Sequence, residues 1–162
     1  MTIGRGFQKR SNNIDKLGYW STTSSVDFCE TNYLWSKYIA EPHNVWSSLS
    51  LVFYGLVGLI YCNPTKEWRV YLMFGVIFVI GLGSCFLHTT LDKIAQSSDE
   101  LPMLWFNIVA LYSLIELKTP RGSNKYSFAA LGACIFAFIQ TVIYYGFQDI
   151  YIGIYIYFYC YY

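Results

Sequence analysis

Four long stretches of the chain contain no Asp, Glu, Lys or Arg, and they limit the possible folds more than any other feature: residues 44–62, 70–91, 101–115 and 126–148. A helix rises about 1.5 Å per residue, so about 20 apolar residues cross a hydrocarbon core roughly 30 Å thick. Three of the stretches reach this length. The run 101–115 is too short unless its helix begins near Ala95, with Asp99 and Glu100 facing protein or water.

A fifth apolar run, residues 150–162, alternates Ile with Tyr and other aromatic residues. This pattern would suit a strand in water, but an open strand edge in lipid leaves backbone groups unpaired. We therefore interpret the run as a truncated fifth helix. The predicted fold class is all-α, a polytopic transmembrane helix bundle with about four complete helices and part of a fifth.

The composition agrees with a membrane protein and excludes other classes. Hydrophobic residues make up 55% of the chain, charged residues 13%, and the formal net charge is +1, which argues against a disordered tail and against a nucleic-acid partner. We divide the chain into a polar N-terminal segment, 1–43, and a membrane-embedded domain, 44–162. Five Lys and Arg flank the helices on one side and two on the other, which predicts a lumenal N-terminal segment.

Ser84 and His88 lie four residues apart near the end of the second predicted helix, and therefore on one helical face. Asp99 follows after a short predicted turn, and we expect it in the first turn of the third helix, facing back toward them. A hydroxyl, an imidazole and a carboxylate would then converge near one membrane surface. Alternatively, the histidine is an interfacial residue and the carboxylate caps its helix.

A second candidate site precedes the first predicted helix and is rich in oxygen ligands: Asp27, Glu30, Asn32 and Glu41. Calcium is bound by six to eight oxygens from carboxylates, amides and backbone carbonyls. The alternative is a solvated loop that contains a helix cap. Cys29 lies in the same segment, where an oxidising compartment could pair it with another cysteine. We interpret His43 as an interfacial residue.

The segments DFCETNY, IAEPHNVWSSLS, GLGSCFLHTTL and QSSDELPMLW, in this order and spacing, resemble the alkaline ceramidases. The resemblance implies a seven-helix enzyme of the endoplasmic reticulum, Golgi or plasma membrane that hydrolyses the ceramide amide to sphingosine and a fatty acid, and we expect the endoplasmic reticulum or Golgi. It implies that His88 binds zinc, that Ser84 acts beside the metal and that Asp99 activates water or moves protons. It also implies a calcium site formed by Asp27, the Phe28 carbonyl and the side chains of Glu30, Asn32 and Glu41.

One part of the family pattern is missing. The family completes its zinc site with two further histidines in an HxxxH motif, and this chain has His43 and His88 only. We therefore interpret it as a C-terminally truncated ceramidase that is inactive alone, because catalytic zinc sites normally have three protein ligands. The alternative is a non-catalytic membrane protein, either receptor-like or a truncated product.

Overall fold

A computed structural model of the chain describes residues 18–25, 28, 30–62, 66–120 and 125–160, with side chains described as far as Phe147. In these residues the backbone forms the helices α2 (Pro42–Tyr61), α3 (Trp68–Thr90), α4 (Lys93–Ile115) and α5 (Ser127–Cys160). The same residues contain one isolated bridge, between Ser36 and Ile39, and no strand. The predicted all-α fold is confirmed.

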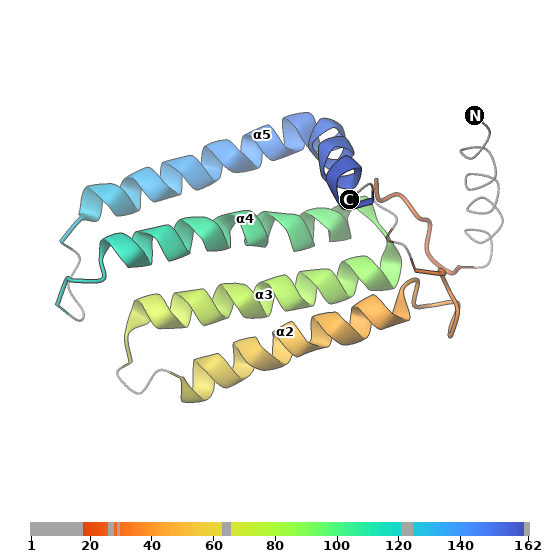
Figure 1. The fold of residues 1–162 in the computed structure, drawn as a ribbon, viewed down its shortest axis with the longest axis horizontal. Coiled ribbons are helices and arrows are strands. Elements are labelled where there is room, and N and C mark those ends of the chain that lie inside the picture. The colour runs from red at the N-terminus through yellow and green to blue at the C-terminus, as the bar shows by residue number, and fades with distance from the viewer. Residues whose placement is uncertain (1–17, 26–27, 29, 63–65, 121–124, 161–162) are drawn as a thin grey trace.

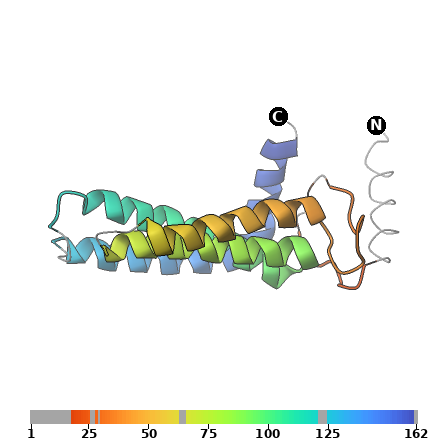
Figure 2. The same ribbon diagram turned by 90° about the horizontal axis from the view of Figure 1, so that it is seen from below.

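The helices lie side by side in chain order, with each one antiparallel to the next (Figure 1). Helix α2 packs on α3, α3 on α4, and α4 on α5. Seen from below, the last part of α5 turns away from the other helices (Figure 2). The turn follows Phe147, whose backbone leaves the helical region with φ −128° and ψ 19°. The predicted short fifth helix is thus helical, and a kink rather than a loop separates it from the preceding one.

Helices α2, α3 and residues 127–147 of α5 are each long and apolar enough to cross a membrane. Helix α4 is less apolar because it carries Asp99 and Glu100 near its start. It begins at Lys93, two residues before the expected Ala95, and runs for 23 residues. At about 1.5 Å per residue this is about 34 Å, which matches a hydrocarbon core.

Glycines allow α2 and α3 to approach closely. A Cβ atom at Gly55 would lie 2.7 Å from the backbone nitrogen of Phe78, and one at Gly81 would lie 2.6 Å from that of Val52. Both distances are too short for a real side chain, so these positions require glycine. Close contact through small residues is typical of helices that pack in membranes.

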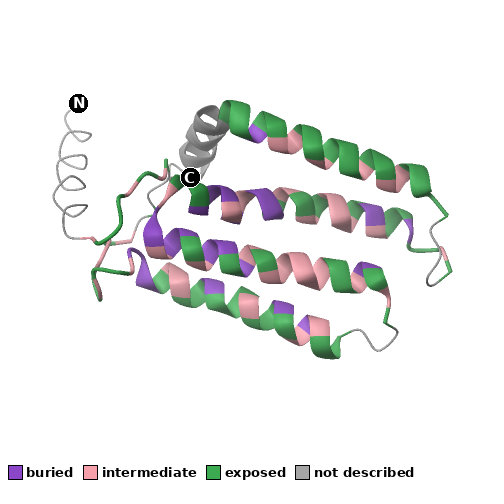
Figure 3. Ribbon diagram, turned by 180° about the vertical axis from the view of Figure 1, so that it is seen from behind, coloured by how far each residue is buried: buried purple, intermediate pink, exposed green. Residues whose placement is uncertain are grey.

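Most of the buried residues gather at the end of the bundle where α3 passes into α4 (Figure 3). Residues 18–41 cover this end, and their backbone bonds to carbonyls that the end of α3 leaves without helical partners. Ala40 N donates to the oxygen of Thr89 at 3.1 Å, and Glu41 N donates to that of His88 at 2.9 Å. The N-terminal segment is therefore part of the folded core at this end.

Candidate active site

Helices α3 and α4 bring Ser84, His88 and Asp99 together at the covered end of the bundle. The exposed fractions of these residues are 8%, 7% and 9%. The Asp99 carboxyl lies near the Ser84 hydroxyl and interacts electrostatically with His88. The structure thus places a hydroxyl, an imidazole and a carboxylate in one buried cluster.

The sequence prediction for the start of α4 was wrong in one respect. The chain turns at Leu91 and Asp92, and Asp92 is the N-cap, with a side chain that accepts a hydrogen bond from Ile94 N at 3.0 Å. Asp99 consequently lies in the second turn of α4 and does not cap the helix. Thr23 donates to Asp92 at 2.7 Å, and this hydrogen bond lowers the pKa of the Asp92 carboxyl.

Gly83 lets α3 and α4 touch backbone to backbone beside the cluster. A Cβ atom at Gly83 would overlap the carbonyl oxygen of Ser98 and would lie 3.0 Å from the backbone nitrogen of Asp99. Because Gly83 precedes Ser84 and Ser98 precedes Asp99, this contact sets how closely the hydroxyl and the carboxyl approach each other.

Ser48 on α2 adds a second hydroxyl, which the sequence analysis missed. Its Oγ donates to the Asn44 carbonyl at 2.7 Å and lies 2.9 Å from Ser84 Oγ. A hydroxyl has one proton, so Ser84 is the donor between the two serines. The Ser84 proton therefore has two acceptors within reach, Ser48 Oγ and the Asp99 carboxyl. The spacing of Ser48 four residues after Asn44 was a signal, because serines in membrane helices often bond the carbonyl four residues earlier.

Glu41 contacts His88 directly. The Oε2 atom of Glu41 lies 2.5 Å from His88 Nδ1, and Glu41 is fully buried. The carboxylate also accepts hydrogen bonds from Phe28 N at 3.1 Å and from Asn44 Nδ2 at 3.2 Å. A carboxylate on one ring nitrogen fixes the orientation of the imidazole and directs the other nitrogen, Nε2, toward a ligand. From the sequence we expected Glu41 only as a calcium ligand, because nothing in the local sequence pattern relates it to His88, which lies 47 positions away.

Two other candidate calcium ligands, Phe28 and Glu30, lie beside the start of α2. Glu30 caps this helix, accepting from His43 N at 2.8 Å and from Asn44 N at 3.2 Å. The aromatic ring of Phe28 lies edge-on to His88, with centroids 4.8 Å apart. Asn32 is half-buried in the same segment. Asp27 and Cys29 lie outside the described residues. We gave a loop with a helix cap as the alternative interpretation of this segment, and the structure contains such a cap, provided by Glu30.

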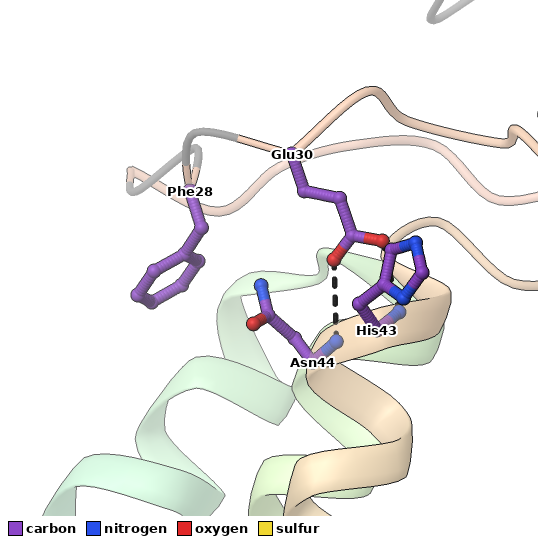
Figure 4. A pocket seen from close by; sticks show the side chains of 4 residues that line it. All are labelled: Phe28, Glu30, His43 and Asn44. Carbon is purple, nitrogen blue, oxygen red and sulfur yellow. Dashed lines mark hydrogen bonds between the residues drawn. The ribbon is translucent and has the colours of Figure 1, made fainter.

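A pocket of about 400 Å³ opens between these residues and the start of α2, lined by Phe28, Glu30, His43 and Asn44. The Glu30 carboxylate reaches down to the first residues of α2, while the Phe28 ring lies across the pocket from it (Figure 4). His43 is exposed and makes an edge contact with Trp35. In the part of the chain that the structure describes, no three His, Cys, Asp or Glu residues are grouped closely enough to hold a metal ion.

A line of partly buried hydrogen bonds connects the N-terminal segment, α4 and α5 beside Asp99. Ser25 N donates to Gln96 Oε1 at 3.0 Å, and Gln96 Nε2 donates to Glu100 Oε1 at 2.9 Å. Tyr144 of α5 donates its hydroxyl to the other oxygen of Glu100 at 2.6 Å. Gln96 is 0% and Tyr144 5% exposed. Glu100 thus faces protein, as a carboxylate at this depth requires, and it joins α5 to the candidate site.

Comparison with known proteins identifies what this arrangement is similar to. The family model described as Ceramidase matches residues 20–162. A putative alkaline ceramidase, dcd3A, of Dictyostelium discoideum is 36% identical over 130 residues, which cover 67% of this chain and 45% of that protein. An alkaline ceramidase of Arabidopsis thaliana is 30% identical over 130 residues, covering 79% and 51%. Alkaline ceramidase 3 of Mus musculus is 33% identical over 115 residues, covering 70% and 43%. The chain spans about half the length of these relatives.

Proposed function

Because the chain belongs to the ceramidase family, we propose that the protein translated from its complete reading frame hydrolyses the amide bond of ceramide-type lipids to sphingosine and a fatty acid. The observation that supports this most strongly is the buried cluster of Ser84, His88 and Asp99 at one end of helices that can cross a membrane. Relatives that carry the name alkaline ceramidase support the substrate class.

The residues of the cluster have distinct proposed roles. Asp99 takes a proton from the attacking water and later delivers it to the nitrogen of the leaving amine, so that water adds across the amide in balance. Ser84 turns its proton toward the carbonyl oxygen, where negative charge develops, and stabilises it. In the structure Ser48 Oγ and the Asp99 carboxyl are the acceptors near this hydroxyl, so the substrate oxygen has to replace one of them.

We propose zinc as the metal of this site, and the surroundings of His88 fit that proposal. Glu41 holds Nδ1 and leaves Nε2 for a metal, the arrangement in which a carboxylate orients a zinc-binding histidine. Zinc bound there would polarise the amide carbonyl and lower the pKa of the attacking water. A catalytic site needs about three protein ligands, and the only other histidine of the chain is the exposed His43. We therefore propose that residues 1–162 alone bind zinc weakly and turn over no substrate.

We propose calcium binding by Asp27, the Phe28 carbonyl, Glu30, Asn32 and Glu41. Hard oxygen donors from one short segment suit this ion. The two described carboxylates are already bonded to N–H groups, but an ionised carboxylate offers about four lone-pair sites and can accept a cation as well. Since Glu41 also contacts His88, loss of calcium would disturb the imidazole.

A membrane location follows from three helices that can span a bilayer, and it suits a substrate with two hydrocarbon chains. We propose that ceramide reaches the site sideways from the lipid. We further propose the endoplasmic reticulum or Golgi as the compartment, with residues 18–41 on the lumenal side. The distribution of basic residues supports this orientation.

The test compares the two histidines of the chain in the protein expressed from its complete reading frame. We expect His88→Ala to lose at least about 10²-fold in sphingosine release, because a zinc ligand and its metal are lost. His43→Ala is the matched control, since His43 is exposed, and it should stay within about twofold of the parent. Equal rates for the two variants would exclude the proposed metal site.

A second candidate function applies to residues 1–162 on their own, namely a non-catalytic membrane protein that pairs with another chain. The observation in its favour is that the chain has a single buried histidine. Purified residues 1–162, reconstituted in lipid with added zinc, should release no sphingosine. Clear turnover by this chain would rule out the second candidate.

A further inference from the structure

The outer surface of the N-terminal segment is aromatic. Six large apolar side chains are between 39% and 65% exposed on residues 18–41 and the first turns of α2: Tyr19, Trp20, Leu34, Trp35, Tyr38 and Trp46. We call these six residues the aromatic cap surface. They lie outside the cluster described above, and neither the proposed chemistry nor the two metals use them.

The two described carboxylates of the same segment point elsewhere. Glu30 turns toward the start of α2, and Glu41 is fully buried against His88. Among the described residues from 18 to 46, Lys37 is the only exposed Lys, Arg, Asp or Glu. A protein surface that faces water would normally carry several exposed charges. The aromatic cap surface therefore differs from an ordinary water-facing surface.

Three rings of this surface, those of Tyr19, Trp20 and Tyr38, are held in an ordered cluster. Trp20 donates its indole N–H to the Tyr38 carbonyl at 2.9 Å. The ring of Tyr19 lies 4.9 Å from Trp20 and 5.2 Å from Tyr38 between centroids. The Lys37 ammonium sits 5.1 Å above the Tyr38 ring. Side chains with an apolar body and a polar tip, beside a long basic chain, are those that anchor proteins at the boundary of a bilayer.

The position of the surface along the helix axes agrees with that boundary. Helix α2 has 20 residues and is therefore about 30 Å long, which equals the hydrocarbon thickness. Its first residue, Pro42, must then lie near one edge of the hydrocarbon, and residues 18–41 must lie at the level of the headgroups. Trp46, in the second turn of α2 and 65% exposed, continues the surface onto the lipid-facing side of that helix.

We infer that the aromatic cap surface binds the headgroup region of the same bilayer that the helices cross. Residues 18–41 are then a membrane-bound layer and not a domain in water, with Trp35 and Leu34 inserted at the boundary between headgroups and acyl chains. The covered end of the bundle, where the buried cluster lies, is thereby fixed at the depth of a lipid headgroup. The inference needs no catalytic activity and does not depend on the proposed function.

Depth-dependent fluorescence quenching tests this inference with residues 1–162 in phosphatidylcholine vesicles. The chain has five tryptophans, and the difference between the parent and Trp35→Phe isolates the emission of Trp35. We expect a nitroxide placed near the lipid headgroup to quench this emission about twofold more than one placed deep in the acyl chain. Trp105→Phe provides the matched control, because Trp105 lies in the middle of α4 and its emission should show the opposite order.

Aqueous iodide gives the complementary readout. Trp35 should be quenched several-fold less in vesicles than free tryptophan amide, because the bilayer shields an interfacial ring from ions. Trp46→Phe, at another exposed position, repeats the measurement in a second variant, and circular dichroism confirms that each variant folds. Full access of iodide to Trp35 and Trp46, with no effect of the shallow nitroxide, would overturn the inference. Shielding from iodide without quenching by either lipid label would also overturn it, in favour of contact with a second copy of the chain.

Discussion

The contact between Gly83 and Ser98 yields the sharpest prediction, because a single added methyl group must separate α3 from α4. In Gly83→Ala the new Cβ would lie 2.6 Å from the carbonyl carbon of Ser98. Non-bonded carbons normally stay about 3.5 Å apart or more, so the helices must move by roughly 1 Å. Both sides of the contact are backbone, and no rotamer change can relieve it.

The expected cost follows from this overlap. Inserting a methylene into a well-packed core costs about 1–3 kcal/mol, and a backbone contact places Gly83→Ala at the upper end. Alanine also favours the helix more than glycine does, which offsets about 0.5–1 kcal/mol of this cost. We therefore expect a net loss of about 2 kcal/mol in the free energy of unfolding. In the complete protein, hydrolysis should fall as well, since Ser84 and Asp99 move apart.

Gly75→Ala is the control in the same helix. A Cβ at Gly75 would meet nothing within 4 Å, so this variant should be as stable as the parent or slightly more stable. Unfolding in mixed micelles, followed by the helical circular-dichroism signal, measures both variants on residues 1–162. If Gly83→Ala and Gly75→Ala unfold at the same detergent fraction, close packing of α3 on α4 at this site is refuted.

Three further predictions concern the N-terminal segment and the second serine. Glu30→Gln should raise the calcium concentration needed for half-maximal activity about tenfold with zinc content unchanged; an unaltered calcium titration would remove Glu30 from the site. Thr23→Val removes the bond that lowers the Asp92 pKa, so it should destabilise the chain at neutral pH. The stabilisation from a lowered pKa is complete above the unfolded pKa and is lost as pH falls through the folded pKa, so the difference in melting temperature should shrink below about pH 4; a gap that stays constant down to pH 2 argues against this linkage. Ser48→Ala should lower kcat about tenfold, and Ser84→Ala about 10²–10³-fold; an equal loss in both would contradict a supporting role for Ser48.

The sequence was sufficient to predict the helices and the pairing of residues one helical turn apart. Uncharged runs located α2, α3 and α5, and the shortness of 101–115 correctly required an earlier start for α4. The spacing of Ser84 and His88 placed them on one face, and both are buried there. These features depend on periodicity and length, which a single chain displays directly.

Contacts between distant segments could not be predicted in the same way. Glu41 meets His88 because Ala40 and Glu41 bond to the last carbonyls of α3, and no local pattern encodes that pairing. Asp99 lies in the second turn of α4 because Asp92 is the N-cap. The adjacent acidic residues Asp99 and Glu100 had themselves been candidates for the cap, so the sequence did not identify Asp92. Tyr144 reached Glu100 only through the packing of α5 on α4.

Asp99→Asn tests the central claim most directly, because it keeps the shape of the side chain and removes its proton chemistry. The measurement is sphingosine release from ceramide by the protein expressed from its complete reading frame, with zinc content determined on the same samples. We predict a zinc content equal to that of the parent and turnover reduced at least about 10²-fold. Near-parental turnover with normal zinc would show that the buried cluster of Ser84, His88 and Asp99 does not use this carboxylate for hydrolysis.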